Sequence, residues 1–97
     1  MKAYSVLDVI VKDDSWVPAY MESVGDIVSK HGGVYLANST NYEFLEGSGN
    51  QDAARVIIEW PSVDAGKAFM SDPAYLPHLK GRQAGTISNH FLIEGKA

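Results

Sequence analysis

The sequence predicts an α+β domain in which a four-stranded antiparallel sheet carries two helices on one face, the ferredoxin-like order strand, helix, strand, strand, helix, strand. Two observations support this prediction. Four segments are rich in β-branched and aromatic residues, and two others have apolar residues every three or four positions. The chain has 97 residues, which is enough for a single domain over residues 1–97 that buries roughly 60 to 70% of its unfolded surface.

The first half of the chain predicts a strand, a helix and a second strand. Residues 3–11 are apolar and β-branched until a polar cluster ends the run, as is typical of a strand. Asp14 or Ser15 then offers the N-cap of a helix that ends at Gly32-Gly33. A second strand is predicted over residues 34–38, with a continuation at 42–46. The residues expected to share one helix face are Trp16, Tyr20, Val24, Ile27 and His31.

The second half repeats this pattern after a polar, glycine-rich hairpin loop at residues 47–52. The third strand is predicted over residues 55–60, and Pro61 ends it. A helix follows from Ser62 or Asp64 to Asp72, because both starting residues favour N-cap positions. Residues 73–80 predict a short helical turn, and the fourth strand covers residues 86–94.

Both faces of the predicted central strands are apolar. In the first strand Leu7 alternates with Val6, and in the third strand Ile58 alternates with Ile57. Two helices cover only one face of such a sheet, so the other face requires a different cover. Packing two copies sheet to sheet provides it, and we therefore expect a homodimer that closes into an α+β barrel.

Composition excludes several classes of function. Eight Lys and Arg against twelve Asp and Glu give a net charge of −4, which repels nucleic acid. The chain has no cysteine and no apolar run approaching the ~20 residues of a membrane span. Its three histidines lack metal-ligand spacing, and no phosphate-binding glycine loop precedes a helix. We expect a cytosolic protein without metal, cofactor, nucleic acid or membrane partner.

Three charged residues of the predicted sheet form one candidate site. Asp8 and Arg55 lie on adjacent strands, and Glu59 follows Arg55 on the same face. They are candidates for substrate binding, and Glu59 for a general base if the neighbouring Trp60 raises its pKa. The alternative is a set of structural ion pairs, with Glu59 as a partner of Arg55 or Arg82, which is the commoner reason for such charges.

A second candidate site combines Tyr20 with the segment before the last strand. Arg82 is predicted in a loop there, where its guanidinium suits a substrate carboxylate. His78 is the candidate proton shuttle, because histidine titrates near neutral pH. We expect a pocket bounded by Tyr20, Glu59, His78 and Arg82. Alternatively, Arg82 ties this segment to the sheet. His90 is expected at the surface of an edge strand.

The sequence also resembles a known bacterial family, the domain-of-unknown-function family numbered 1330. The matching segments span nearly the whole chain in order, so their combination is more specific than any one of them. They are Ala3-Tyr4, residues 31–36, Leu45-Glu46-Gly47, residues 55–62, residues 65–69, Pro73-Ala74-Tyr75, Arg82 with Ala84, and Ile93-Glu94-Gly95.

The resemblance implies a fold and a homodimer but no reaction. The family is placed among dimeric α+β barrels, whose members include cofactor-free monooxygenases, isomerases, lyases and haem-binding enzymes, so the fold alone does not select a function. One hypothesis is a cofactor-independent enzyme or a binding protein for a small organic acid. The alternative is a non-catalytic dimeric module that binds a partner.

Overall fold

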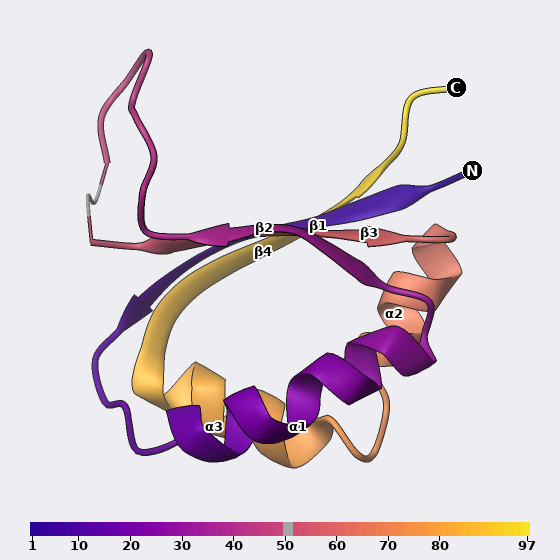
Figure 1. Ribbon diagram of the computed structural model, residues 1–97, viewed down its shortest axis with the longest axis horizontal. Helices are drawn as coiled ribbons and strands as arrows, with labels where there is room; N and C mark the ends of the chain where they lie inside the picture. The colour runs from indigo at the N-terminus through magenta and orange to yellow at the C-terminus, as the bar shows by residue number, and fades with distance from the viewer. Residues whose placement is uncertain (50–51) are drawn as a thin grey trace.

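The computed structural model describes residues 1–49 and 52–97, and these residues confirm the predicted ferredoxin-like α+β fold. The four strands form one antiparallel sheet in the order β2-β3-β1-β4. Figure 1 shows the helices layered against a single face of this sheet. The elements are β1 (Ala3–Val11), α1 (Val17–Lys30), β2 (Val34–Ser39), β3 (Ala54–Trp60), α2 (Val63–Met70), α3 (Leu76–Gly85) and β4 (Thr86–Glu94).

Helix α1 begins later than predicted. Its first residue is Val17 and Trp16 occupies the N-cap position without a side-chain capping bond. The predicted cap residues form a turn instead, in which the Ser15 amide donates to the Asp13 carboxylate and the Val17 amide donates to the Asp14 carbonyl. Local side-chain bonds of this kind compete with helix formation.

The segment between β2 and β3 also differs from the prediction. Residues 42–46 form no strand. The Arg55 guanidinium lies 4.8 Å from the Tyr42 ring centroid and 5.4 Å from that of Phe44, so these aromatic side chains pack against a cation rather than continue a ladder. Of the predicted hairpin loop at 47–52, Asn50 and Gln51 lie outside the described residues.

The core lies between the sheet and the helices. Trp60 and Tyr75 are each 1% exposed, and the Phe69 ring centroid lies 5.1 Å from that of Trp60 and 4.1 Å from that of Tyr75. The indole of Trp60 donates to Ser5 Oγ, which satisfies a buried N–H group. This aromatic cluster fixes α2 and the start of α3 against β1 and β3.

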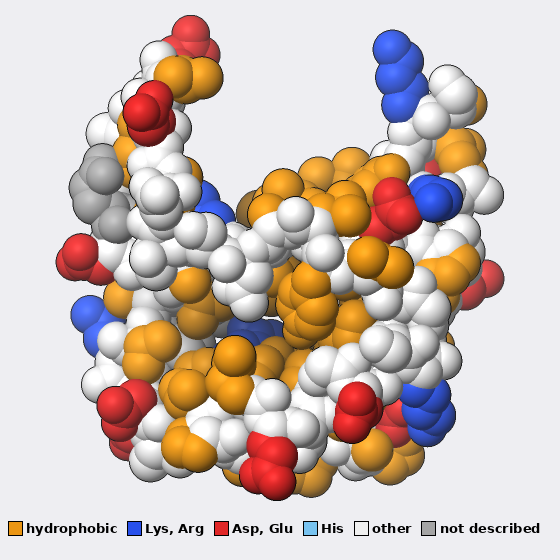
Figure 2. All heavy atoms as spheres, viewed as in Figure 1, with side chains coloured by type: hydrophobic (Ala, Val, Ile, Leu, Met, Phe, Trp, Pro, Cys, Tyr) orange, Lys and Arg blue, Asp and Glu red, His pale blue; other side chains and the backbone are white. Residues whose placement is uncertain are grey.

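The face of the sheet turned away from the helices, called the open face below, is apolar and exposed. Figure 2 shows it as a trough of hydrophobic side chains between the β2–β3 connection and the ends of the chain. In the register, Val6 of β1 lies between Ile57 of β3 and Phe91 of β4. Phe91 is 63% exposed, so the expectation of two apolar sheet faces is confirmed.

Candidate functional site

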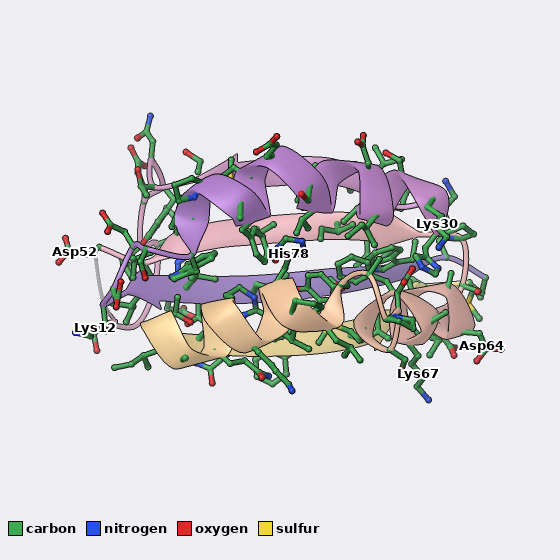
Figure 3. All side chains as sticks on the ribbon, turned by 90° about the horizontal axis from the view of Figure 1, so that it is seen from below. Lys12, Lys30, Asp52, Asp64, Lys67 and His78 are labelled. Atoms are coloured by element: carbon green, nitrogen blue, oxygen red, sulfur yellow. The ribbon has the colours of Figure 1, made fainter. Side chains whose placement is uncertain are left out.

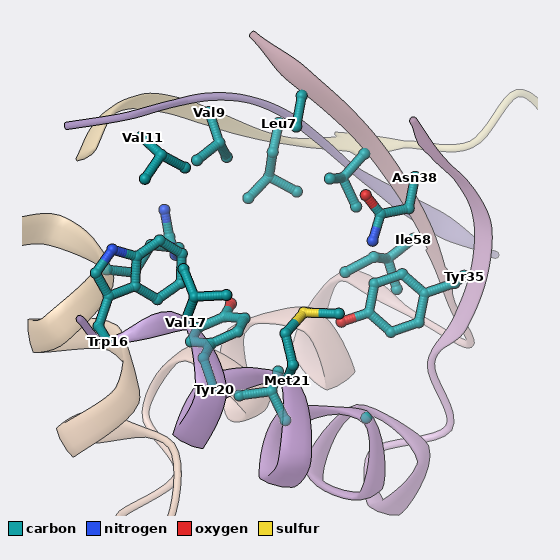
Figure 4. A pocket seen from close by; sticks show the side chains of 15 residues that line it. Leu7, Val9, Val11, Trp16, Val17, Tyr20, Met21, Tyr35, Asn38 and Ile58 are labelled. Atoms are coloured by element: carbon teal, nitrogen blue, oxygen red, sulfur yellow. The ribbon is translucent and has the colours of Figure 1, made fainter. Parts of the chain in front are cut away.

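A cavity of about 440 Å³ separates helix α1 from the sheet. Its sheet wall is aliphatic and includes Leu7, Val9 and Ile58, whereas α1 and the turn before it contribute Tyr20 and Trp16 (Figure 4). A largely apolar pocket of this size with a few polar groups suits a small organic molecule.

Arg82 is the charged residue of this lining and is only 4% exposed. Its Nη1 donates to Ser88 Oγ at 3.0 Å, and its Nε has no hydrogen-bond partner among the described residues. No carboxylate in residues 1–49 and 52–97 forms an ion pair with it. A buried guanidinium without a counter-charge is unfavourable, so the cavity presents an anion-binding group with no anion supplied by the described residues.

Arg82 occupies a helix rather than the predicted loop, because α3 continues past the expected end of the turn to Gly85. Two glycines of α3 permit this. A Cβ at Gly81 would lie 3.1 Å from Trp16 Cβ, and one at Gly85 would overlap the Trp16 indole. The close approach of α3 to Trp16 therefore fixes the helix that carries Arg82, although glycine lowers helix propensity.

Tyr20 supplies a hydroxyl to the same cavity. Its oxygen lies 2.9 Å from the hydroxyl oxygen of Tyr75. Tyr75 is 1% exposed, and either hydroxyl can be the donor in this bond. When Tyr75 donates, the O–H of Tyr20 is free to donate to a ligand. Burial, with a smaller contribution from Tyr75, raises the pKa of Tyr20 and keeps it protonated.

The two histidines near this region have different surroundings from those predicted. His78 belongs to α3, is labelled between α1 and α3 in Figure 3, and packs edge to face with the Tyr20 ring, with centroids 6.3 Å apart, but it does not line the cavity. His90 is half-buried rather than exposed, and its Nε2 is 2.8 Å from Ser5 Oγ. Burial, followed by the charge of Arg82, lowers the pKa of His90.

Glu59, Asp8 and Arg55 lie on the open face, on the other side of the sheet from the cavity. The structure therefore brings Tyr20 and Arg82 together but separates Glu59 from them. Glu59 accepts hydrogen bonds from Lys2 Nζ at 2.8 Å and from the Tyr4 hydroxyl at 3.2 Å. The bond from Lys2 is the main cause that lowers the pKa of Glu59, opposite to the raised pKa that a general base would need. Asp8 pairs with Arg55 in the register.

Sequence reasoning missed Met21, Gly25 and Asn38 at the mouth of the cavity. Met21 is 69% exposed, and Gly25 follows it by one helical turn on α1. Asn38 and Tyr35 form the opposite side of the mouth on β2. Met21 lies three residues before Val24 on the predicted helix, which was a usable signal for Met21, whereas the sequence pattern gave no signal for Gly25 or Asn38.

Within residues 1–49 and 52–97, no group of three or more histidine, cysteine, aspartate or glutamate residues is placed to hold a metal ion. The helices of that same part of the chain are too short and too polar to cross a membrane.

Comparison with known sequences and structures identifies the family. The model of the domain of unknown function DUF1330 matches residues 2–96. The chain belongs to the DUF1330 family. No curated protein matches the sequence of this DUF1330 chain.

Solved structures share the fold. RPA0582, a protein of unknown function from Rhodopseudomonas palustris, is 21% identical with a TM-score of 0.79, covering 99% of this chain and 83% of that one. SnoaB from Streptomyces nogalater, a cofactor-independent oxygenase, is 16% identical with a TM-score of 0.67 and coverages of 99% and 94%. An antibiotic biosynthesis monooxygenase is 16% identical with a TM-score of 0.62 over the whole of both chains. At these identities the likeness concerns the fold.

Proposed function

We propose that the cavity binds a small, mostly apolar organic acid, whose acidic group is held by Arg82 and Tyr20. The observation that carries the proposal is the buried guanidinium of Arg82, which lines an apolar cavity and has no carboxylate partner in the described chain. An anionic ligand would remove the unfavourable burial of that charge, and the aliphatic wall from β1 and β3 would bury the rest of the ligand.

The proposal extends to a cofactor-independent enzyme, because two proteins of this fold carry the names cofactor-independent oxygenase and antibiotic biosynthesis monooxygenase. In such an enzyme Tyr20 is the donor that touches the ligand, and His78 is the candidate proton shuttle through its contact with the Tyr20 ring. Glu59, Asp8 and Arg55 belong to the open face and are assigned to the contact between two copies.

The assembly we propose is a homodimer joined through the open face, in the bacterial cytosol. Exposed apolar side chains on β2, β3 and β4, namely Val34, Ile57 and Phe91, support the contact. The bacterial sources of RPA0582 and SnoaB support the setting.

The binding proposal is tested by comparing small carboxylic acids with their uncharged amides in thermal unfolding of the purified protein. We expect a responding acid at 100 times its Kd to stabilise the protein by about 2.7 kcal/mol, and its amide to have much less effect because it lacks the charge that meets Arg82. Equal responses to acid and amide, or no response to a broad panel of acids, would reject the proposal and favour the non-catalytic dimeric module.

Two variants separate binding from folding. Arg82→Met removes the charge but also loses the bond to Ser88, so it is paired with Gly25→Leu, which places a side chain beside the mouth of the cavity. A Cβ at Gly25 meets no atom within 4 Å, so this variant should fold. We expect it to weaken acid binding while circular dichroism stays unchanged.

A further inference from the structure

The cavity has polar groups at two opposite ends. Arg82 approaches from α3 and bonds to Ser88 on β4, and it is 4% exposed, so it forms the inner end. Asn38 and Tyr35 belong to β2, the strand at the other edge of the sheet, and Tyr35 is 41% exposed, so they form the mouth. Neighbouring strands lie about 4.8 Å apart, which places the two edge strands roughly 14 Å apart across an aliphatic middle.

A β-bulge places both mouth residues on the cavity side. Tyr35 pairs with Ile58 and Asn38 pairs with Val56, while Leu36 is the extra residue between them. Regular alternation would put residues 35 and 38 on opposite faces of the strand. The bulge reverses this, and bulges commonly redirect side chains beside binding sites. Figure 4 shows the Asn38 amide and the Tyr35 ring turned toward the cavity.

Both mouth side chains have unused hydrogen-bonding groups. Among the described residues, neither the Asn38 amide nor the Tyr35 hydroxyl has a hydrogen-bond partner. An amide and a phenol each offer a donor and an acceptor, so together they suit a hydroxyl or carbonyl group. Burial raises the pKa of Tyr35, which keeps its phenol available as a donor.

We propose that the ligand is an elongated acid with a second polar group at the end opposite the carboxylate, such as a hydroxyaryl alkanoate, and that Asn38 and Tyr35 recognise this second group. The inference rests on the proposed function, because it assumes that Arg82 holds the acidic end. The apolar middle of the cavity, lined by Leu7, Val9 and Val56, then encloses the ring or chain between the two polar groups.

The test compares two ligands that differ by one hydroxyl, 3-phenylpropionate and 3-(4-hydroxyphenyl)propionate, by isothermal titration calorimetry. For the unmodified protein we expect the hydroxylated acid to bind about tenfold more tightly, the effect of one well-formed hydrogen bond. In the double variant Asn38→Ala with Tyr35→Phe, this preference should fall to about twofold or less, while the affinity for 3-phenylpropionate stays the same.

The outcomes separate the two proposals. If both acids bind equally well to the unmodified protein, the second polar contact is rejected and the acid-binding function stands. If the preference survives in the double variant, Asn38 and Tyr35 are not its source and the inference is likewise rejected. If neither acid binds at saturating concentration while the protein is folded, the acid-binding function itself is rejected for this ligand class.

Discussion

Gly25 lies at the mouth of the cavity in the interior of α1, and a Cβ built there meets no atom within 4 Å. Replacing a helical glycine by alanine removes unfolded-state freedom without introducing a clash. We predict that Gly25→Ala stabilises the protein by about 1 kcal/mol, measured by urea denaturation as a higher midpoint with an unchanged slope.

Gly66→Ala is the matched control for this prediction. Gly66 is also helical, but a Cβ there would lie 2.9 Å from Leu92 Cδ1 and 3.2 Å from Trp60 Cδ1. The same gain in helix propensity is then opposed by crowding between α2 and the sheet. Equal stabilisation by both substitutions would show that the open space at Gly25 is not the reason for its effect.

At the residue scale, the sequence predicted which residues share a strand face but not which face the helices cover. Alternation placed Asp8, Arg55 and Glu59 together, as the register shows. Because both faces of β1 and β3 are apolar, nothing in the pattern indicated that Glu59 points away from Arg82. Tyr20 was placed correctly on the face of its helix that packs toward the sheet, because the apolar residues of that helix recur every three or four positions and so mark a single face.

At the element scale, the prediction was wrong where a tertiary contact decided the outcome. Gly81 and Gly85 have low helix propensity, which is why a loop was predicted around Arg82. In the structure, their close packing against Trp16 holds them in α3. The bulge in β2 was equally hidden, because residues 34–38 show regular strand composition and the extra residue becomes visible only when β2 is paired with β3. Both errors fall on elements that shape the cavity.

Asp72 connects the end of α1 with the segment that precedes α3. Its Oδ2 lies 2.7 Å from His31 Nε2 and 3.2 Å from Lys30 Nζ, both at the end of α1, and its Oδ1 accepts from the Ala74 amide before α3. The bond to His31 is the main cause that lowers the pKa of Asp72 to about 2. A lowered carboxylate pKa means that the ionised form is stabilised by folding.

This contact predicts acid lability of the helical layer. An unfolded aspartate has a pKa of about 3.9, so Asp72 contributes its full stabilisation above that value and loses it as the pH falls toward about 2. We predict that Asp72→Asn is less stable than the unmodified protein at pH 7, and that the difference shrinks between about pH 4 and pH 2. Denaturation at a series of pH values measures it; a difference that stays constant below pH 4 would contradict this role for the carboxylate.

At the scale of the whole molecule, the open face leaves apolar side chains exposed in a single copy, among them Phe91 at 63% and Ile57 at 37%. Apolar rows, such as Phe91, Val6 and Ile57, lie beside a polar row in which Asp8 pairs with Asn89 and Arg55. Packing two such faces would remove the apolar rows from water and align the polar row with its counterpart across a two-fold axis. The cavity lies on the other side of each sheet, so two acid-binding sites would remain accessible in the dimer.

Phe91→Asp tests this assembly, because a two-fold contact would bury the new carboxylate twice. Burying an unpaired charge costs about 3 kcal/mol or more, so two of them weaken a dimer by roughly 10,000-fold. Sedimentation velocity at micromolar concentration should show the mass falling from twice 10.5 kDa to 10.5 kDa. Met21→Asp is the control, because Met21 is similarly exposed at 69% but lies on α1, so its dimer should persist. A monomeric unmodified protein, or equal dissociation in both variants, would rule out the open face as the contact.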